Sequence, residues 1–166
     1  MRWDLMIEAG PVVMVHAGTA VLAFGLGMAV LWRRKGGRLH KSLGKVWVAL
    51  MVVVSVSSFG INEIRLWGNF SPIHLLSIYT LGSLAFAIYA IRKGDIKSHQ
   101  DTMRQLFVSA LIIAGAFTFL PNRLMARFMG GETLSLAMPF IWLAVPLLVW
   151  LVYRAKVQGR DAEPAE

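Results

Sequence analysis

Five long runs of apolar residues alternate with short polar segments along the chain. The runs cover about residues 11–32, 42–59, 71–91, 100–120 and 134–153. Each run is close to the roughly 20 residues that an α-helix needs to cross a bilayer. A helix suits this environment because it satisfies all of its backbone polar groups internally. The pattern therefore predicts an all-α fold, an integral membrane bundle of five transmembrane helices.

The third run begins with the clearest start signal in the chain. Ser71 is a residue type that caps helices, and Pro72 fits the first helical position, where its missing N–H costs nothing. His74 follows about one turn inside the predicted helix. An ionisable side chain inside a membrane span is a functional-site hypothesis by default. We therefore interpret the other four runs as helices that pack around the third.

Basic residues define the predicted topology. Lys and Arg collect between the first and second runs, between the third and fourth runs, and after the fifth. The positive-inside rule assigns these segments to the cytoplasm and the N-terminus to the outside. The chain then divides into a short external N-terminus (residues 1–10), a transmembrane domain (11–153) and a cytoplasmic tail (154–166) that we expect to be disordered.

Composition supports a membrane protein and excludes several classes of site. The chain has 166 residues, of which 57% are hydrophobic and only 16% are charged. Soluble domains have about a quarter charged residues. The absence of cysteine excludes disulfides, thiolate metal sites and iron–sulfur clusters. The net charge of +8 comes from basic residues that collect in the predicted cytoplasmic segments. We therefore expect contact with membrane lipid and no nucleic-acid partner.

The four histidines fall into two pairs once the topology is drawn. His16 and His74 lie near the outer ends of the first and third runs. His40 and His99 lie at the inner ends of the second and fourth runs. Each pair comes from alternate helices, and the two levels are separated by roughly 20–25 Å at ~1.5 Å rise per residue.

Paired imidazoles at two levels are what a transmembrane electron carrier requires. Neutral imidazole nitrogens fill both axial positions of a b-type haem, and a helical bundle can hold the ring in its core. The candidate axial ligands of one or two haem irons are His16, His74, His40 and His99. The electron partner would be a quinone, a small reductant or a redox partner protein. An enzyme of this kind would be a membrane oxidoreductase.

Other interpretations of these residues stay open. Each histidine alone also fits a packing or interfacial role. Arg104, one turn into the fourth run, pairs either with a haem propionate or with a lipid phosphate. Asp95, His99 and Asp101 could form a cytoplasmic zinc site with His40. A protein without a redox cofactor that binds a lipid or a small hydrophobic ligand is an alternative function, and an accessory membrane subunit is another.

Four motifs carry a resemblance over about residues 11–150. They are RLHKSLGK at 38–45, FSPIHLLS at 70–77, His99 with Met103 and Arg104, and LPNRL at 120–124. They resemble a family of small bacterial inner-membrane proteins that is defined only as a domain of unknown function. The resemblance implies a multi-pass protein of the bacterial inner membrane, and it implies no activity.

A remoter resemblance concerns the arrangement of helices and histidines. It is similar to that of the two-haem b-type transmembrane cytochromes, the cytochrome b561 and ferric-reductase group. This resemblance implies that His16 and His74 hold an outer haem and that His40 and His99 hold an inner one. Those cytochromes keep their ligands inside the hydrophobic layer, whereas His40 and His99 lie at its edge among lysines. The outer pair therefore matches the cytochromes more closely.

Overall fold

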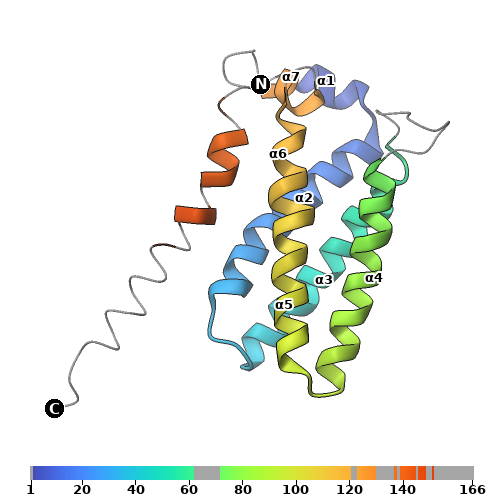
Figure 1. The fold of residues 1–166 in the computed structure, drawn as a ribbon. Coiled ribbons are helices and arrows are strands. Elements are labelled where there is room, and N and C mark those ends of the chain that lie inside the picture. The colour runs from blue at the N-terminus through green and yellow to red at the C-terminus, as the bar shows by residue number, and fades with distance from the viewer. Residues whose placement is uncertain are drawn as a thin grey trace.

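Every regular element in the described part of the chain is a helix (Figure 1). The computed structural model describes residues 2–61, 72–120, 123–129, 137, 139–144, 146–148 and 151. The elements are α1 (Trp3–Glu8), α2 (Pro11–Trp32), α3 (Arg38–Ser58), α4 (Pro72–Arg92), α5 (Ile96–Leu106), the π-helix η1 (Phe107–Ile113), α6 (Ala114–Thr118) and α7 (Leu124–Met129). The all-α prediction is confirmed for these residues.

Three helices in the described ranges are long and apolar enough to cross a membrane. They are α2, α3 and the Ile73–Arg92 part of α4. Where the fourth span is predicted, α5, η1 and α6 follow one another without a break. Parts of the predicted fifth span (134–153), the proposed cap Ser71 and the whole tail (154–166) lie outside the described residues. The count of five spans therefore stays a prediction.

Two helices begin earlier than their apolar runs. α3 starts at Arg38 rather than at residue 42, and α5 starts at Ile96 rather than at residue 100. A helix can continue past the apolar layer because its backbone bonds do not depend on the surroundings. His40 and His99 are therefore helical residues in the first turns of α3 and α5, and they are not loop residues.

Asp95 explains where α5 begins. Gly94 has a positive φ of 84°, which glycine adopts without strain, and turns the chain after α4. The carboxylate of Asp95 then accepts a hydrogen bond from the backbone amide of Ser98 at 3.0 Å. This is an N-cap, which satisfies an amide that has no partner inside the helix.

Replacing Asp95 with alanine is expected to loosen the first turn of α5, because the Ser98 amide loses its acceptor. Hydrogen bonds from Ser98 hold the pKa of Asp95 below its ordinary value of 3.8. The charged carboxylate therefore stabilises the fold fully above that value, and this contribution is lost as the pH falls through the lowered pKa. Hydrogen exchange of the Ser98 amide should be faster in Asp95→Ala at neutral pH and nearly unchanged in Asp95→Asn, which keeps an acceptor. Equal exchange in wild type and Asp95→Ala would contradict the cap.

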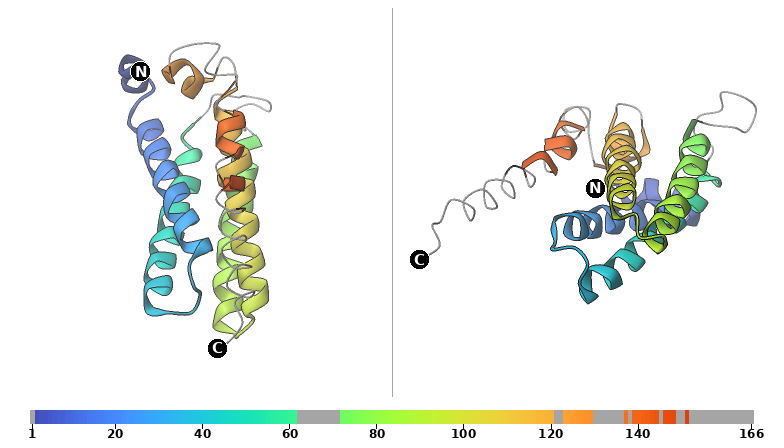
Figure 2. Two further views of the ribbon diagram at one scale, coloured as in Figure 1. Left: turned by 90° about the vertical axis from the view of Figure 1, so that its left-hand side faces the viewer. Right: turned by 60° about the horizontal axis from the view of Figure 1, so that its bottom comes forward.

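The long helices form a ring of four. α2 packs on α3, α3 on α4, α4 on α5, and η1 closes the ring by packing on α2. The left view of Figure 2 separates the α2 and α3 pair from the pair made by α4 and the helix of α5, η1 and α6. Consecutive long helices run in opposite directions (Figure 1). As a result, α2 lies diagonally opposite α4, and α3 lies diagonally opposite α5.

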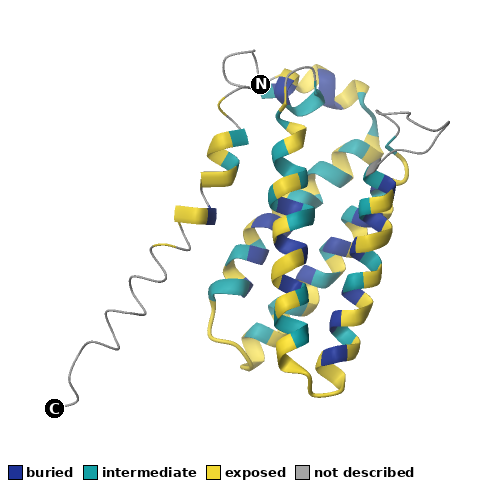
Figure 3. Cartoon of the chain, in the orientation of Figure 1, coloured by how far each residue is buried: buried dark blue, intermediate teal, exposed yellow. Residues whose placement is uncertain are grey.

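The bundle exposes large apolar side chains and buries small and hydroxyl-bearing ones. Leu22, Phe86 and Tyr89 are more than half exposed, whereas Ser58 and Thr80 are 2% exposed or less. The right-hand helix α4 in Figure 3 shows the alternation of exposed and buried positions along its length. A soluble protein would not expose so many large apolar residues, but lipid accepts them, and polar groups then gather at helix contacts.

Aromatic packing holds the middle of the bundle together. The indole Nε1 of Trp47 donates to the carbonyl of Ala23 at 2.9 Å and joins α3 to α2. The ring of Phe24 stacks on that of Phe107 with centroids 5.7 Å apart, and it stacks on Trp142 at 4.1 Å. These contacts bring α2, η1 and the segment after residue 137 to one core.

Two short helices lie together at one end of the bundle. The backbone amide of Arg2 donates to the carbonyl of Phe128 at 3.0 Å. The ring of Trp3 meets the ring of Phe128 edge-on at 5.1 Å. α1 buries Leu5 and Met6, and α7 buries Ala126 and Phe128. We call this end of the bundle the α1 end and the opposite end, with the turns at 33–37 and 93–95, the turn end.

Candidate functional site

The helix directions bring the four histidines to the two ends in pairs. His16 in α2 and His74 in α4 lie at the α1 end, near the starts of their helices. His40 in α3 and His99 in α5 lie at the turn end, also near the starts of their helices. Each pair therefore comes from diagonally opposite helices of the ring.

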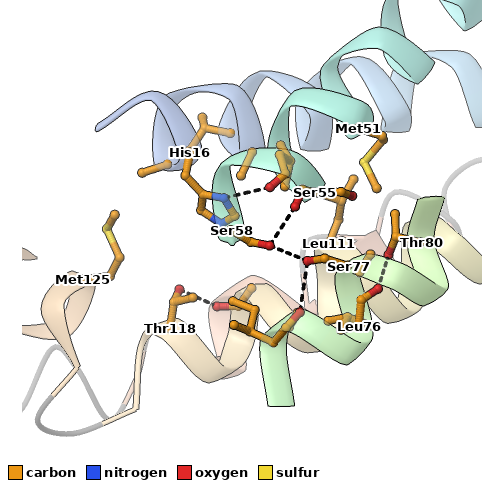
Figure 4. Close-up of a pocket in the computed structure, with 18 of the residues that line it drawn as sticks. His16, Met51, Ser55, Ser58, Leu76, Ser77, Thr80, Leu111, Thr118 and Met125 are labelled. Carbon is orange, nitrogen blue, oxygen red and sulfur yellow. Dashed lines mark hydrogen bonds between the residues drawn. The ribbon is translucent and has the colours of Figure 1, made fainter. Parts of the chain in front are cut away.

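A cavity of about 140 Å³ lies between the helices near the α1 end. Its walls come from α2, α3, α4 and the helix of η1 and α6, and they include His16, Met51 and Trp142 (Figure 4). Five hydroxyl-bearing side chains line it, and the rest of the wall is mostly alanine and other apolar residues. The hydroxyl residues are Ser55, Ser58, Ser77, Thr80 and Thr118. Small residues on all sides leave room in the centre of the bundle.

The ring of His16 is held by the neighbouring helix. Its Nδ1 atom lies 3.0 Å from the carbonyl oxygen of Val54 and 3.0 Å from the hydroxyl of Ser57. A carbonyl only accepts, so Nδ1 carries the proton in this bond and Nε2 keeps its lone pair. A histidine fixed in this way by a backbone carbonyl has the orientation that metal-ligating histidines commonly have.

His74 is more deeply buried than His16. It is 4% exposed, and its ring stacks on Phe59 with centroids 5.4 Å apart. Its helical neighbours Ile73, Leu76 and Ser77 form part of the cavity wall, whereas His74 is not one of the lining residues. Ser77 also shares a hydrogen bond with Ser58, which joins α4 to α3 beside the cavity. His74 therefore sits in the same layer of the bundle as the cavity.

The two histidines at the turn end differ in their hydrogen bonds. The Nδ1 atom of His99 lies 2.9 Å from the carbonyl oxygen of Ala87 in α4, so His99 has the same tautomer as His16. The Nδ1 atom of His40 is buried without a hydrogen-bond partner in the described part of the chain. Such a group is rare, and it calls for an explanation.

The zinc alternative finds no support in the described ranges. No group of three or more histidine or carboxylate side chains there lies close enough to hold a metal ion. Asp95 serves as the cap of α5, and Asp101 pairs with Arg104 at 3.3 Å. Arg104 is more than half exposed on the outer side of α5, and its predicted role beside a haem propionate is not tested.

The hydroxyl-bearing cavity wall was not foreseen from the sequence. Ser55 and Ser58 are spaced i, i+3 in α3, and Ser77 and Thr80 have the same spacing in α4. This spacing puts each pair on one face of its helix. The signal was present as a repeated polar position inside apolar spans, but single serines in membrane helices also bond to their own backbone, as Thr80 does to Leu76.

Comparisons with known proteins give a family and nothing more specific. A family model described as a predicted membrane protein (DUF2306) matches residues 13–153. Neither the curated proteins nor the solved structures gave a match. The comparisons thus offer no support for the remoter resemblance to two-haem cytochromes. A haem site has to be argued from the residues of this chain alone.

Proposed function

This chain belongs to DUF2306, a family of membrane proteins whose function is unknown, and we propose that it is a transmembrane b-type cytochrome. In this proposal His16 and His74 hold a haem at the α1 end, and His40 with His99 hold one at the turn end. Electrons pass between the two ends, with a quinone or a redox protein as the partner.

The diagonal placement of the histidine pairs carries the proposal. A flat macrocycle with two axial imidazoles needs its ligands on opposite sides of a space. In a ring of four helices, diagonal helices meet this need and adjacent ones do not. His16 and His74 come from α2 and α4, and His40 and His99 from α3 and α5.

The donor chemistry of the histidines suits haem iron. The Nδ1–H groups of His16 and His99 donate hydrogen bonds to the backbone carbonyls of Val54 and Ala87. This leaves Nε2 of each ring available as a ligand atom. The buried Nδ1 of His40 has no hydrogen-bond partner in the described chain. A bound ligand would supply a partner for this atom. The donors at the turn end therefore match a bis-histidine site as well as His16 does.

The free volume at the α1 end limits the fit. The cavity of about 140 Å³ is smaller than the roughly 300–1,000 Å³ of ligand pockets, so a haem there requires the helices to open. The hydrogen bond between Ser58 and Ser77 joins α3 to α4 at this cavity. It is the first polar contact that such an opening would change.

Haem, when bound, supplies an iron that takes up and returns one electron. The residues of the chain would do the rest. The histidines hold the iron, the carbonyls of Val54 and Ala87 orient two of the rings, and the apolar helices exclude water and ions. A five-span bundle of the bacterial inner membrane, with the N-terminus outside and the turn end in the cytoplasm, would carry charge across the membrane. The basic turn at residues 33–37 supports this orientation.

An absorption spectrum tests the proposal. Protein purified in detergent after expression with a haem precursor is expected to contain about two haems per chain. Its reduced-minus-oxidised spectrum should be that of low-spin haem with two histidine ligands. Colourless protein from haem-replete cells, correctly folded by circular dichroism, would overturn the proposal and favour a lipid-binding or accessory role.

A further inference from the structure

A second hollow lies on the outer side of the bundle, away from the histidines. It is a groove of about 670 Å³ between α2, the helix of α5 and η1, and the segment around residues 143–147. Its walls are apolar and include Trp32, Phe107 and Leu147. We call it the α2/η1 groove. Its volume lies within the range of ligand pockets.

Two basic side chains line the α2/η1 groove toward the turn end. Lys35 comes from the turn after α2, and Arg104 comes from the second half of α5. The two side chains thus share one wall of the groove. Burial and the guanidinium of Arg104 hold the pKa of Lys35 below its usual range. Arg104 also contacts Asp101 at 3.3 Å, in a solvent-exposed pair whose strength is expected to be small.

The groove continues away from the charges along one side of the helix. Arg104, Val108 and Ile112 follow at intervals of four residues, and all three line the groove. They extend it by roughly 10 Å toward the middle of the bundle, at ~1.5 Å or less per residue. A ligand that fills this shape is negatively charged at one end and apolar along the other.

We propose that the α2/η1 groove binds one anionic phospholipid, with its phosphate between Lys35 and Arg104 and an acyl chain along Val108 and Ile112. Charge complementarity favours this occupant, because two cations that line one groove, with a single exposed carboxylate beside them, attract an anion. The basic turn at residues 33–37 is also the segment that the positive-inside rule assigns to the leaflet rich in anionic lipid.

Binding of defined lipids to the purified full-length protein tests the site. Native mass spectrometry and thermal unfolding in detergent would compare phosphatidylglycerol, phosphatidylcholine and inorganic phosphate. Phosphatidylglycerol is expected to bind one per chain and to raise the melting temperature. Inorganic phosphate at the same concentration should bind far more weakly, because it has no chain to bury. A response to phosphatidylcholine equal to that of phosphatidylglycerol would overturn the proposal.

Variants distinguish lipid binding in this groove from a general attraction of anionic lipid to the basic surface. Lys35→Ala with Arg104→Ala should weaken phosphatidylglycerol binding roughly tenfold or more, since two charge-assisted contacts are lost. Arg34→Ala with Lys41→Ala removes the same charge from exposed positions at the turn end and should leave binding unchanged. Val108→Trp fills the exposed groove wall without changing charge and should also weaken it. Equal binding by both charge variants would refute the site.

Discussion

Removing one histidine from each pair is expected to remove haem from one end of the bundle at a time. His16→Ala and His99→Ala should each lower the Soret absorbance per protein to about half, and the double variant should have none. The reason is the diagonal arrangement: each histidine serves a different pair, and the pairs lie at opposite ends of the helices. The measurement is haem content by pyridine haemochrome against protein concentration.

Ser57→Ala is the matched control for His16→Ala. It removes one of the two groups near Nδ1 of His16 but leaves the carbonyl of Val54 in place. The ring should keep its orientation, so this variant is expected to retain both haems. Full Soret absorbance in the double histidine variant would exclude this pairing. Equal loss in Ser57→Ala and His16→Ala would mean that packing at the α1 end is being measured and not ligation.

Replacing Gly27 with alanine is expected to destabilise the bundle by about 1–3 kcal/mol, the usual cost of overpacking a core. A Cβ atom at this position would lie 2.6 Å from Nε1 of Trp47 and 2.7 Å from the ring of Phe107. Both neighbours are buried, and Trp47 is held by its hydrogen bond to Ala23. The contact among α2, α3 and η1 would therefore have to widen. Unfolding in detergent with increasing denaturant measures the loss.

Gly25→Ala is the control for this prediction. A Cβ atom at Gly25 would meet nothing within 4 Å. Both substitutions gain the same helix propensity of alanine over glycine, about 1 kcal/mol, so their difference isolates the steric effect. Gly25→Ala should be neutral or stabilising. If both variants unfold alike, the close approach of the three helices at Gly27 is wrong.

The helical fold followed from features that are local in sequence. Apolar runs of sufficient length, with Pro72 as a start signal for the third, predicted α2 and α4 almost to the residue. The starts of α3 and α5 were predicted too late, because Arg38 and Ile96 lie in polar surroundings that resemble loops. Asp95 was considered as a metal ligand, although its position before Ser98 also matched a helix cap.

The site could be predicted only in part, because its details depend on contacts between helices. The grouping of the histidines by depth needed only the direction of each span. Which carbonyl meets His16 or His99 depends on how neighbouring helices rotate, and Val54 and Ala87 are apolar residues without any signal in their side chains. The π-helix η1, which lines both the central cavity and the α2/η1 groove, likewise has no marker in its apolar sequence.

The contact between α1 and α7 has a consequence for how the protein is made. The Phe128 ring that meets Trp3 is synthesised only after α1 to α6 have been made. Until then α1 lacks its contacts with α7. Nascent chains stalled before Phe128 should therefore remain open at the α1 end.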